Sequence, residues 1–231
     1  MCGRFTLKTP VERLSEKFQF PQIIPLKPRY NIAPSQSVAV VRRLTDDADR
    51  TLAMLRWGLI PTWEKDLTKA RKPINAKSET VADLPSFRAA FRQRRCLIPA
   101  DGFYEWKQEG GRKQPVYIAM KDGEPFAFAG LWEHWEKPDQ EPIDSCVLLT
   151  TEPNELLVQV HNRMPVILEP KNYDLWLDPD LQEVSRLKTL LLSYPPDQMT
   201  VYPVNLRVNN PKHDDPLCIE PLPQTERGGT L

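Results

Sequence analysis

The chain has 231 residues, of which 40% are hydrophobic and 27% charged, with 31 basic and 31 acidic side chains. This length allows one large domain or two small ones, and the composition is typical of a soluble globular protein. The zero net charge gives no support to nucleic-acid binding, so such a function would need a local basic surface. The longest apolar runs fall short of the ~20 residues that span a bilayer, and no secretory signal follows Arg4. We therefore expect an intracellular, cytoplasmic protein without membrane partners, and by default a monomer.

The four cysteines lie far apart in the sequence and form no CxxC pair. This pattern predicts neither a zinc site nor a disulfide framework, so we expect no metal and no cofactor. Cys96 and Cys146 lie in apolar runs, which favours buried, inert thiols. The 24 prolines are spread along the chain, at about twice the usual ~5%, and indicate irregular connections between short elements.

The first half of the chain begins with a helix and continues with strands. Thr9-Pro10-Val11-Glu12 is a capping-box pattern, and it predicts a short helix that ends near Phe20. Short apolar runs joined by the polar turn Thr45–Arg50 predict two strands over 37–42 and 51–57. The polar stretch 74–80 is predicted to be a loop, and 86–94 an amphipathic helix.

The second half is a series of strands followed by short helices. Further strands are predicted over 95–99, 103–107, 116–120, 125–132, 144–151, 165–168 and 199–206. Helices are predicted over 151–160, ended by Pro165, and over 172–177 and 181–192. We expect one α+β domain over residues 2–222, built around a mainly antiparallel, barrel-like sheet with flanking short helices, and a disordered tail over 223–231.

Cys2 becomes the first residue if an aminopeptidase removes Met1. Its α-amine and thiol then form a 1,2-aminothiol, which condenses with an aldehyde to an imine and closes to a five-membered thiazolidine. Reference pKa values of about 8 and 8.5 leave both groups partly unprotonated near neutrality. Cys2 is therefore a candidate trap for carbonyl compounds, and the alternative is an ordinary residue near a frayed terminus.

Glu105 lies within the aromatic strand Phe103-Tyr104-Glu105-Trp106. By period-2 alternation it shares a face with Phe103 and Lys107. A carboxylate among aromatic residues is a candidate for a raised pKa and for acid–base work. The alternative is a strand-edge glutamate paired with Lys107.

Two further polar residues stand where they could take part in a reaction. His161 lies at the predicted end of a helix, whose dipole favours the charged imidazole, and it is a candidate acid–base residue or a simple C-cap. Asn75 lies in a polar loop and is either a hydrogen-bond donor to a developing charge or a turn former. Trp63, like Trp57 and Phe87, could stack on an exposed base or belong to the core.

Several basic residues could form a local phosphate-binding surface or a merely solvated face. Arg4 is two residues from the aminothiol, and Arg163 is two residues from His161. The local basic residues that could form this surface are Arg4, Lys77, Arg88, Arg92, Arg94, Arg95 and Arg163.

The combination of motifs is more specific than any one of them. In chain order they are Cys2-Gly3-Arg4-Phe5, Arg29-Tyr30-Asn31-Ile32-Ala33-Pro34, Trp57-Gly58-Leu59-Ile60-Pro61, Asn75-Ala76-Lys77-Ser78-Glu79-Thr80, Cys96-Leu97-Ile98-Pro99-Ala100-Asp101-Gly102-Phe103-Tyr104-Glu105-Trp106 and His161-Asn162-Arg163-Met164-Pro165. From Cys2 to about Asn210 the chain resembles the SRAP family (SOS-response-associated peptidase) of bacterial and human abasic-site processing proteins.

The resemblance implies a one-domain α+β fold around a barrel-like sheet, with a positively charged cleft for single-stranded DNA. It implies that Cys2 traps the C1′ aldehyde of a ring-opened abasic deoxyribose as a thiazolidine crosslink, which shields the lesion in the DNA damage response. Asn75 would hydrogen-bond the sugar, and Glu105 would sense the abasic site and move protons. His161 would stabilise the opened sugar. Action on DNA would place the protein at the nucleoid.

The resemblance also implies DNA contacts. Arg4 and Arg163 match phosphate contacts, and Lys77 stands where some members have arginine, so it would hold phosphate without a bidentate fork. Pro85-Ser86 occupies a stretch where other members place a basic residue and a bulky wedge. Trp63 is therefore our candidate for base stacking.

Two other functions stay open at this stage. The family name points to an autoproteolytic or thiol peptidase that uses Cys2, with a lyase reaction through the imine as a further activity. A non-catalytic reader of modified DNA bases is the second alternative. Replication-fork partners are not predicted by the sequence.

Overall fold

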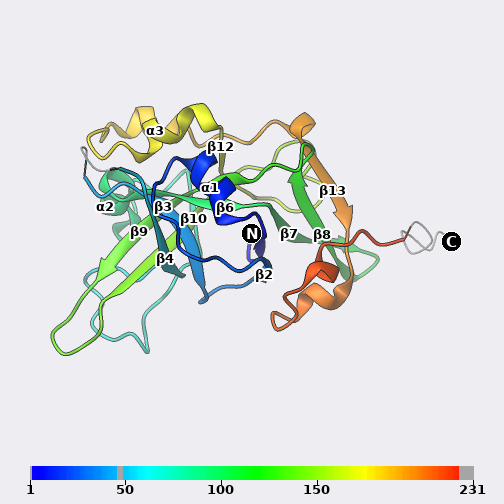
Figure 1. Cartoon of the computed structure of the whole chain (residues 1–231), viewed down its shortest axis with the longest axis horizontal. Coiled ribbons are helices and arrows are strands. Elements are labelled where there is room, and N and C mark those ends of the chain that lie inside the picture. The colour runs from blue at the N-terminus through cyan, green and yellow to red at the C-terminus, as the bar shows by residue number, and fades with distance from the viewer. Residues whose placement is uncertain (1, 46–48, 224–231) are drawn as a thin grey trace.

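In the computed structural model, residues 2–45 and 49–223 are described, and they form two β-sheets with short helices around them (Figure 1). The strands are β1 Phe5–Leu7, β2 Arg29–Ile32, β3 Ser37–Arg42, β4 Thr51–Trp57, β5 Asn75–Lys77, β6 Arg95–Ala100, β7 Gly102–Glu109, β8 Arg112–Met120, β9 Phe126–Trp135, β10 Ile143–Thr151, β11 Met164–Pro165, β12 Ile167–Leu168 and β13 Met199–Pro203. The α-helices are α1 Val11–Phe18, α2 Pro85–Gln93, α3 Tyr173–Leu177 and α4 Val184–Lys188. Four 3-10 turns complete the elements: η1 Pro170–Asn172, η2 Pro196–Gln198, η3 Leu206–Asn209 and η4 Pro216–Cys218.

The larger sheet closes on itself. Its strands follow the order β10-β4-β3-β6-β9, and β9 pairs again with β10, which completes a ring. The β10–β4 contact is parallel and covers only Ser145↔Arg56 and Cys146↔Trp57, after which β5 takes the place of β4 beside β10. The predicted barrel-like sheet is therefore confirmed as a closed ring that is not a regular barrel.

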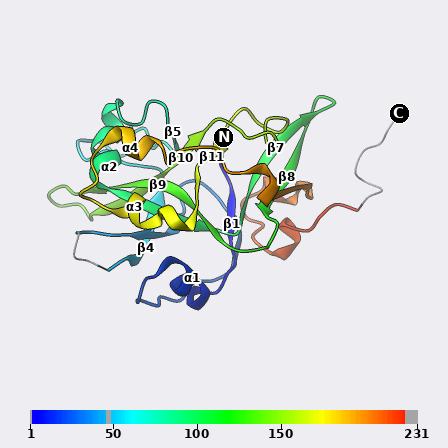
Figure 2. The same cartoon turned by 90° about the horizontal axis from the view of Figure 1, so that it is seen from above.

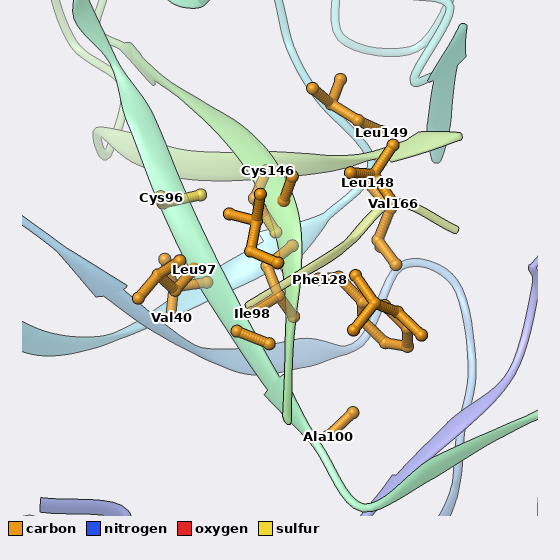
Figure 3. Close-up of a cluster of buried hydrophobic side chains, with 14 of the residues drawn as sticks. Val40, Cys96, Leu97, Ile98, Ala100, Phe128, Cys146, Leu148, Leu149 and Val166 are labelled. Atoms are coloured by element: carbon orange, nitrogen blue, oxygen red, sulfur yellow. The ribbon is translucent and has the colours of Figure 1, made fainter. Parts of the chain in front are cut away.

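Apolar side chains from the ring strands fill its interior (Figure 3). Val40, Ile98, Phe128 and Leu148 come from four different strands and are fully buried. Burying one such side chain contributes roughly 1.5–3 kcal/mol, so this core is the main source of stability. Cys96 and Cys146 are buried there too, and burial raises the pKa of each thiol, as expected for inert cysteines.

The second sheet has the order β13-β8-β7-β1-β2, and all its pairings are antiparallel. In both views β1 runs between the ring and the β7–β8 hairpin (Figures 1 and 2). Phe5 of β1 packs edge-on against Trp57 and Phe128 of the ring. Gly102, opposite Thr6 of β1, leaves room for the Tyr117 ring of β8, because a Cβ at this position would lie 2.3 Å from the Tyr117 side chain. The N-terminal strand is thus built into the core and carries Cys2 with it.

The helices lie outside the sheets. α3 packs on β6 and α2 on β9, while α1 follows β1 and buries Val11, Leu14 and Phe18. None of the helices in the described part of the chain has the length and hydropathy that a bilayer crossing requires.

Most predicted elements are confirmed, and four predictions are wrong. Of the helix predicted over 181–192, only Val184–Lys188 (α4) is helical. Residues 155–160 form hydrogen-bonded turns instead of a helix. Asn154 caps the first turn by accepting from Leu157 N–H, but the main-chain bonds Val158 N–H to Asn154 and His161 N–H to Leu157 close separate turns that do not continue as an α-helix. The polar stretch 74–80 contains β5, since its main chain completes the sheet beside β10. Thr9 does not cap α1, because its hydroxyl donates to Asp101. From residue 224 on, the predicted tail lies outside the described residues.

Candidate active site

Cys2 is held in place by contacts of the strand that follows it. The Asp101 carboxylate accepts the main-chain N–H groups of Lys8 (2.5 Å) and Thr9 (3.0 Å), together with the Thr9 hydroxyl. Tyr104 N–H donates to the carbonyl of Arg4 at 3.0 Å, which joins the start of the chain to β7. The N-terminal segment is therefore fixed by hydrogen bonds on both sides of β1, and Cys2 is fully buried.

Asn75 contacts Cys2 directly. Its side-chain amide donates a hydrogen bond of 2.9 Å to the main-chain carbonyl of Cys2. Asn75 opens β5, whose pairing with Leu148 of β10 fixes its main chain. Among the described residues, the other amide atom, Oδ1, is buried and accepts no hydrogen bond. Asn75 thus tethers Cys2 with one end of its amide and can accept a hydrogen bond from a bound molecule with the other.

Glu105 is a buried carboxylate on β7, only 4% exposed. As the alternation predicts, its neighbours Tyr104 and Trp106 belong to a separate apolar cluster, while Phe103 lies in the main core. Lys107 pairs with Glu109 and not with Glu105, so the alternative of a simple edge ion pair is wrong. Burial raises the pKa of Glu105, and the charge of His161 partly opposes this effect. The carboxyl is therefore suited to hold and release a proton nearer to neutral pH than an exposed glutamate.

The Cys2 thiol lies close enough to Glu105 for the two groups to interact electrostatically. Burial, and then the charge of Glu105, raise the pKa of the thiol far above its ordinary value. The thiol is therefore protonated at neutral pH, and it is a poor nucleophile until a base removes its proton. Glu105, which interacts with the thiol, is the candidate for this base.

His161 follows the turns at 155–160 and interacts electrostatically with Glu105. The main-chain N–H of Arg163 donates to His161 Nδ1 at 3.0 Å. Since Nδ1 accepts a hydrogen bond, a neutral ring carries its proton on Nε2 and can donate from there. The structure thus brings Cys2, Asn75, Glu105 and His161 together from four separate parts of the chain.

The predicted phosphate-binding residues fall into two groups. Arg4 Nη1 donates to Asn31 Oδ1 and to the carbonyl of Val208, both at 2.8 Å, and Arg163 is paired with Glu79. Both arginines are thus engaged by the protein itself. Lys77 on β5 and Arg88 on α2 are exposed instead.

A groove leads from the site to an exposed tryptophan. It has a volume of about 670 Å³ and is lined by Asn75 at one end and by Trp63, which is 51% exposed. Leu84, Pro85 and Phe87 also line the groove, together with Glu64, Arg71 and Lys72. Trp57, by contrast, is fully buried and belongs to the core.

Comparison with known proteins identifies the family. The family model described as SOS response associated peptidase (SRAP) matches residues 1–211. The chain belongs to the SRAP family. It is 44% identical over 224 residues to the abasic site processing protein YoqW of Bacillus subtilis, covering 95% of this chain and 99% of that protein. It is 33% identical to the abasic site processing protein HMCES of Xenopus tropicalis, over 88% of this chain and 69% of that one.

The SRAP fold is also found in solved structures. A crystal structure of a protein from Bacteroides thetaiotaomicron superposes with a TM-score of 0.86 at 25% identity, covering 96% of this chain and 100% of that one. The two sheets, with β1 in the smaller one, therefore belong to a fold that this chain shares with a solved relative.

Three residues that shape this SRAP site were not singled out from the sequence. Asp101 anchors β1, Asn31 receives Arg4, and Glu79 pairs with Arg163. All three lie inside the quoted motifs, and only their partners, which are more than 25 residues away in sequence, reveal their roles. Among the described residues, no group of three or more His, Cys, Asp or Glu side chains is placed to hold a metal ion.

Proposed function

We propose that this SRAP chain senses abasic sites in single-stranded DNA and traps them covalently through Cys2 after removal of Met1. The observation that carries the proposal is the convergence of Asn75, Glu105 and His161 on a buried cysteine whose amine becomes the chain terminus. The names of the relatives, abasic site processing proteins, support the same substrate.

The reaction is a condensation that releases one water. The Cys2 amine adds to the C1′ aldehyde of the ring-opened sugar, and the resulting carbinolamine loses water to give an imine. The imine nitrogen keeps its proton, and the sulfur then bonds to C1′ as Glu105 takes the thiol proton, which closes the thiazolidine and restores the proton that Glu105 gave to the departing water. The raised pKa of the thiol supports this order, because the amine is the stronger nucleophile while the thiol keeps its proton.

Glu105 and His161 move the protons of this sequence. Glu105 gives a proton to the departing hydroxyl of the carbinolamine and takes one from the Cys2 thiol, which its raised pKa supports. His161 donates from Nε2 to the ring oxygen of the sugar as the ring opens, in keeping with the acceptor role of its Nδ1. Asn75 Oδ1 accepts a hydrogen bond from a sugar hydroxyl, which would satisfy this buried atom.

The DNA strand runs along the groove between Trp63 and Asn75 on this proposal. Trp63 stacks on a base next to the lesion, and the exposed Leu84 across the groove replaces the wedge that Pro85-Ser86 lacks. Lys77 and Arg88 contact phosphates, since both are exposed. Arg4 and Arg163 contact phosphate only with those guanidinium N–H groups that make no hydrogen bond within the protein.

The alternatives are less well supported. A thiol peptidase works best with a thiolate of lowered pKa, whereas burial and Glu105 raise the pKa of Cys2. Lyase cleavage needs the imine as an electron sink, and ring closure by the thiol removes it. A reader of modified bases would use the groove but would not need Cys2.

The test is a crosslinking assay with protein whose Met1 removal is verified by mass. Single-stranded DNA with one abasic site should give a heat-stable adduct, and the same strand without the lesion should give none. Cys2→Ala should abolish the adduct, whereas a reader of modified bases would keep its binding. Equal yields of stable adduct with Cys2→Ser would contradict the thiazolidine, because the oxygen analogue closes a more labile ring. Release of Met1 that depends on Glu105, in a system without aminopeptidase, would favour the peptidase.

A further inference from the structure

Glu79 and Arg163 form a two-pronged ion pair next to the candidate site. Arg163 Nη1 lies 2.7 Å from Glu79 Oε1, and Nη2 lies 3.0 Å from Oε2. Nη2 also donates to the carbonyl of Thr150 at 2.6 Å. The hydrogen bonds from Arg163 lower the pKa of Glu79, so the pair is charged at neutral pH. A bidentate pair fixes the orientation of a guanidinium more firmly than a single contact does.

This pair joins the two segments that carry Asn75 and His161. Glu79 lies four residues after Asn75, and Ser78 N–H donates to the Thr150 carbonyl at 2.8 Å. Arg163 lies two residues after His161 and binds the same carbonyl. The end of β10 is therefore the meeting point of both segments, and Glu79–Arg163 is the side-chain contact between them.

The pair also acts on the His161 ring through the main chain. Arg163 N–H is the donor to His161 Nδ1, so the position of the Arg163 backbone determines which ring nitrogen carries the proton. With Arg163 held at its side chain by Glu79 and Thr150, this N–H remains directed at Nδ1. Nε2–H is then presented to the site.

We propose that Glu79 is a positioning residue, which through Arg163 holds His161 in its Nε2–H form at a fixed distance from Asn75. This inference rests on the proposed function, in which His161 donates to the sugar. It differs from a shielding role, in which Glu79 would merely neutralise Arg163 and compete with DNA phosphate. Loss of the Glu79 charge slows the reaction if Glu79 positions His161, and it strengthens DNA binding and speeds the reaction if Glu79 only shields Arg163.

The experiment compares Glu79→Gln, Glu79→Asp and Glu152→Gln. Glu152 is an exposed glutamate that lines the same surface hollow as Glu79, so Glu152→Gln removes an equal charge from the same neighbourhood and leaves Arg163 alone. Single-turnover adduct formation on single-stranded abasic DNA gives the maximal rate and the half-saturating DNA concentration. The maximal rate should fall about tenfold or more in Glu79→Gln, with half-saturation unchanged or lower. Glu79→Asp should recover part of the rate, and Glu152→Gln should match the wild type.

A second measurement does not depend on crosslinking. Nitrogen-15 NMR of the labelled histidine rings should show His161 with an unprotonated Nδ1 and a protonated Nε2, and Glu79→Gln should mix the two forms. An unchanged rate together with an unchanged His161 spectrum in Glu79→Gln would overturn the proposal, as would a faster reaction with tighter binding. If the wild type forms no adduct, the proposed function fails, while the His161 spectra still decide the positioning role.

Discussion

The side-chain amide of Asn75 donates to the main-chain carbonyl of Cys2 at 2.9 Å, so Asn75 of β5 holds the proposed nucleophile in place. Replacing Asn75 tests the two ends of its amide separately. Asn75→Ala removes both, and we expect adduct formation to slow by roughly 100-fold. Asn75→Asp keeps an acceptor oxygen and loses the Nδ2–H donor, so it should retain part of the rate if the sugar contact matters more than the tether. The measurement is the single-turnover rate on abasic single-stranded DNA. Wild-type rates in Asn75→Ala would remove Asn75 from the site.

Glu105→Gln should slow crosslinking and stabilise the fold. The rate should fall by roughly 100-fold, as is typical for loss of an acid–base residue. Burial raises the pKa of Glu105 above the value of about 4.3 in the unfolded chain. The protonated carboxyl therefore stabilises the folded state below pH ~4, and this stabilisation is lost as pH rises through the folded-state pKa. Glutamine is neutral at every pH. It should therefore raise Tm at pH 7 and leave Tm nearly unchanged at pH 4.

The pH dependence of the wild-type rate provides the check on this assignment. The low-pH limb should have its midpoint above the ordinary glutamate pKa and should disappear in Glu105→Gln. A Glu105→Gln protein with the wild-type limb, or with a lower Tm at pH 7, would contradict the role given to this carboxyl.

Much of the fold and part of the site could be predicted from the sequence. Short apolar runs locate the ring strands, and period-2 alternation within β7 places Glu105 on a face separate from Tyr104 and Trp106. Local pattern fails where distant main chain decides the structure. β5 is a strand because β10 offers unpaired main-chain groups beside it, and nothing within residues 74–80 indicates that.

Side-chain partners are the other part that local pattern does not predict. Arg4 resembles a phosphate contact in the sequence, yet Asn31 and the carbonyl of Val208, 27 and 204 residues away, occupy its Nη1. Glu79 looks like an ordinary charged residue until the fold brings Arg163 to it, 84 residues later. The motif marks the place of these residues, and the tertiary structure gives their roles.

Arg4 and Lys77 should behave differently when each is changed. Lys77 is exposed, so Lys77→Ala should reduce the salt dependence of DNA binding by a slope of about 1 and change the free energy of unfolding by less than about 0.5 kcal/mol. Arg4→Lys loses the fork that binds Asn31 and Val208, and we expect it to destabilise the fold by roughly 1–3 kcal/mol. Urea unfolding and salt titrations of binding measure both. The reverse pattern would make Arg4 the phosphate contact and Lys77 the structural residue.

Trp63→Ala should weaken reversible binding to single-stranded DNA without unfolding the protein. One base–aromatic stack is worth about 1–3 kcal/mol, which corresponds to roughly a tenfold loss of affinity or more. Binding should be measured in a Cys2→Ala background, because that variant cannot form the crosslink and only reversible binding remains. Leu44→Ala is the control, since Leu44 is a similarly exposed apolar residue (53%) in the turn after β3. Equal losses in both variants would argue against stacking on Trp63.

The central claim is that the amine and the thiol of Cys2 both bond to C1′ of the abasic sugar. Mass spectrometry of the digested adduct tests it most directly. We expect an N-terminal peptide that lacks Met1, carries the sugar at Cys2 with the loss of one water, resists borohydride reduction and has no free thiol. A linkage at a lysine, a retained Met1, or an adduct that borohydride reduces and that leaves the Cys2 thiol open to alkylation would contradict it.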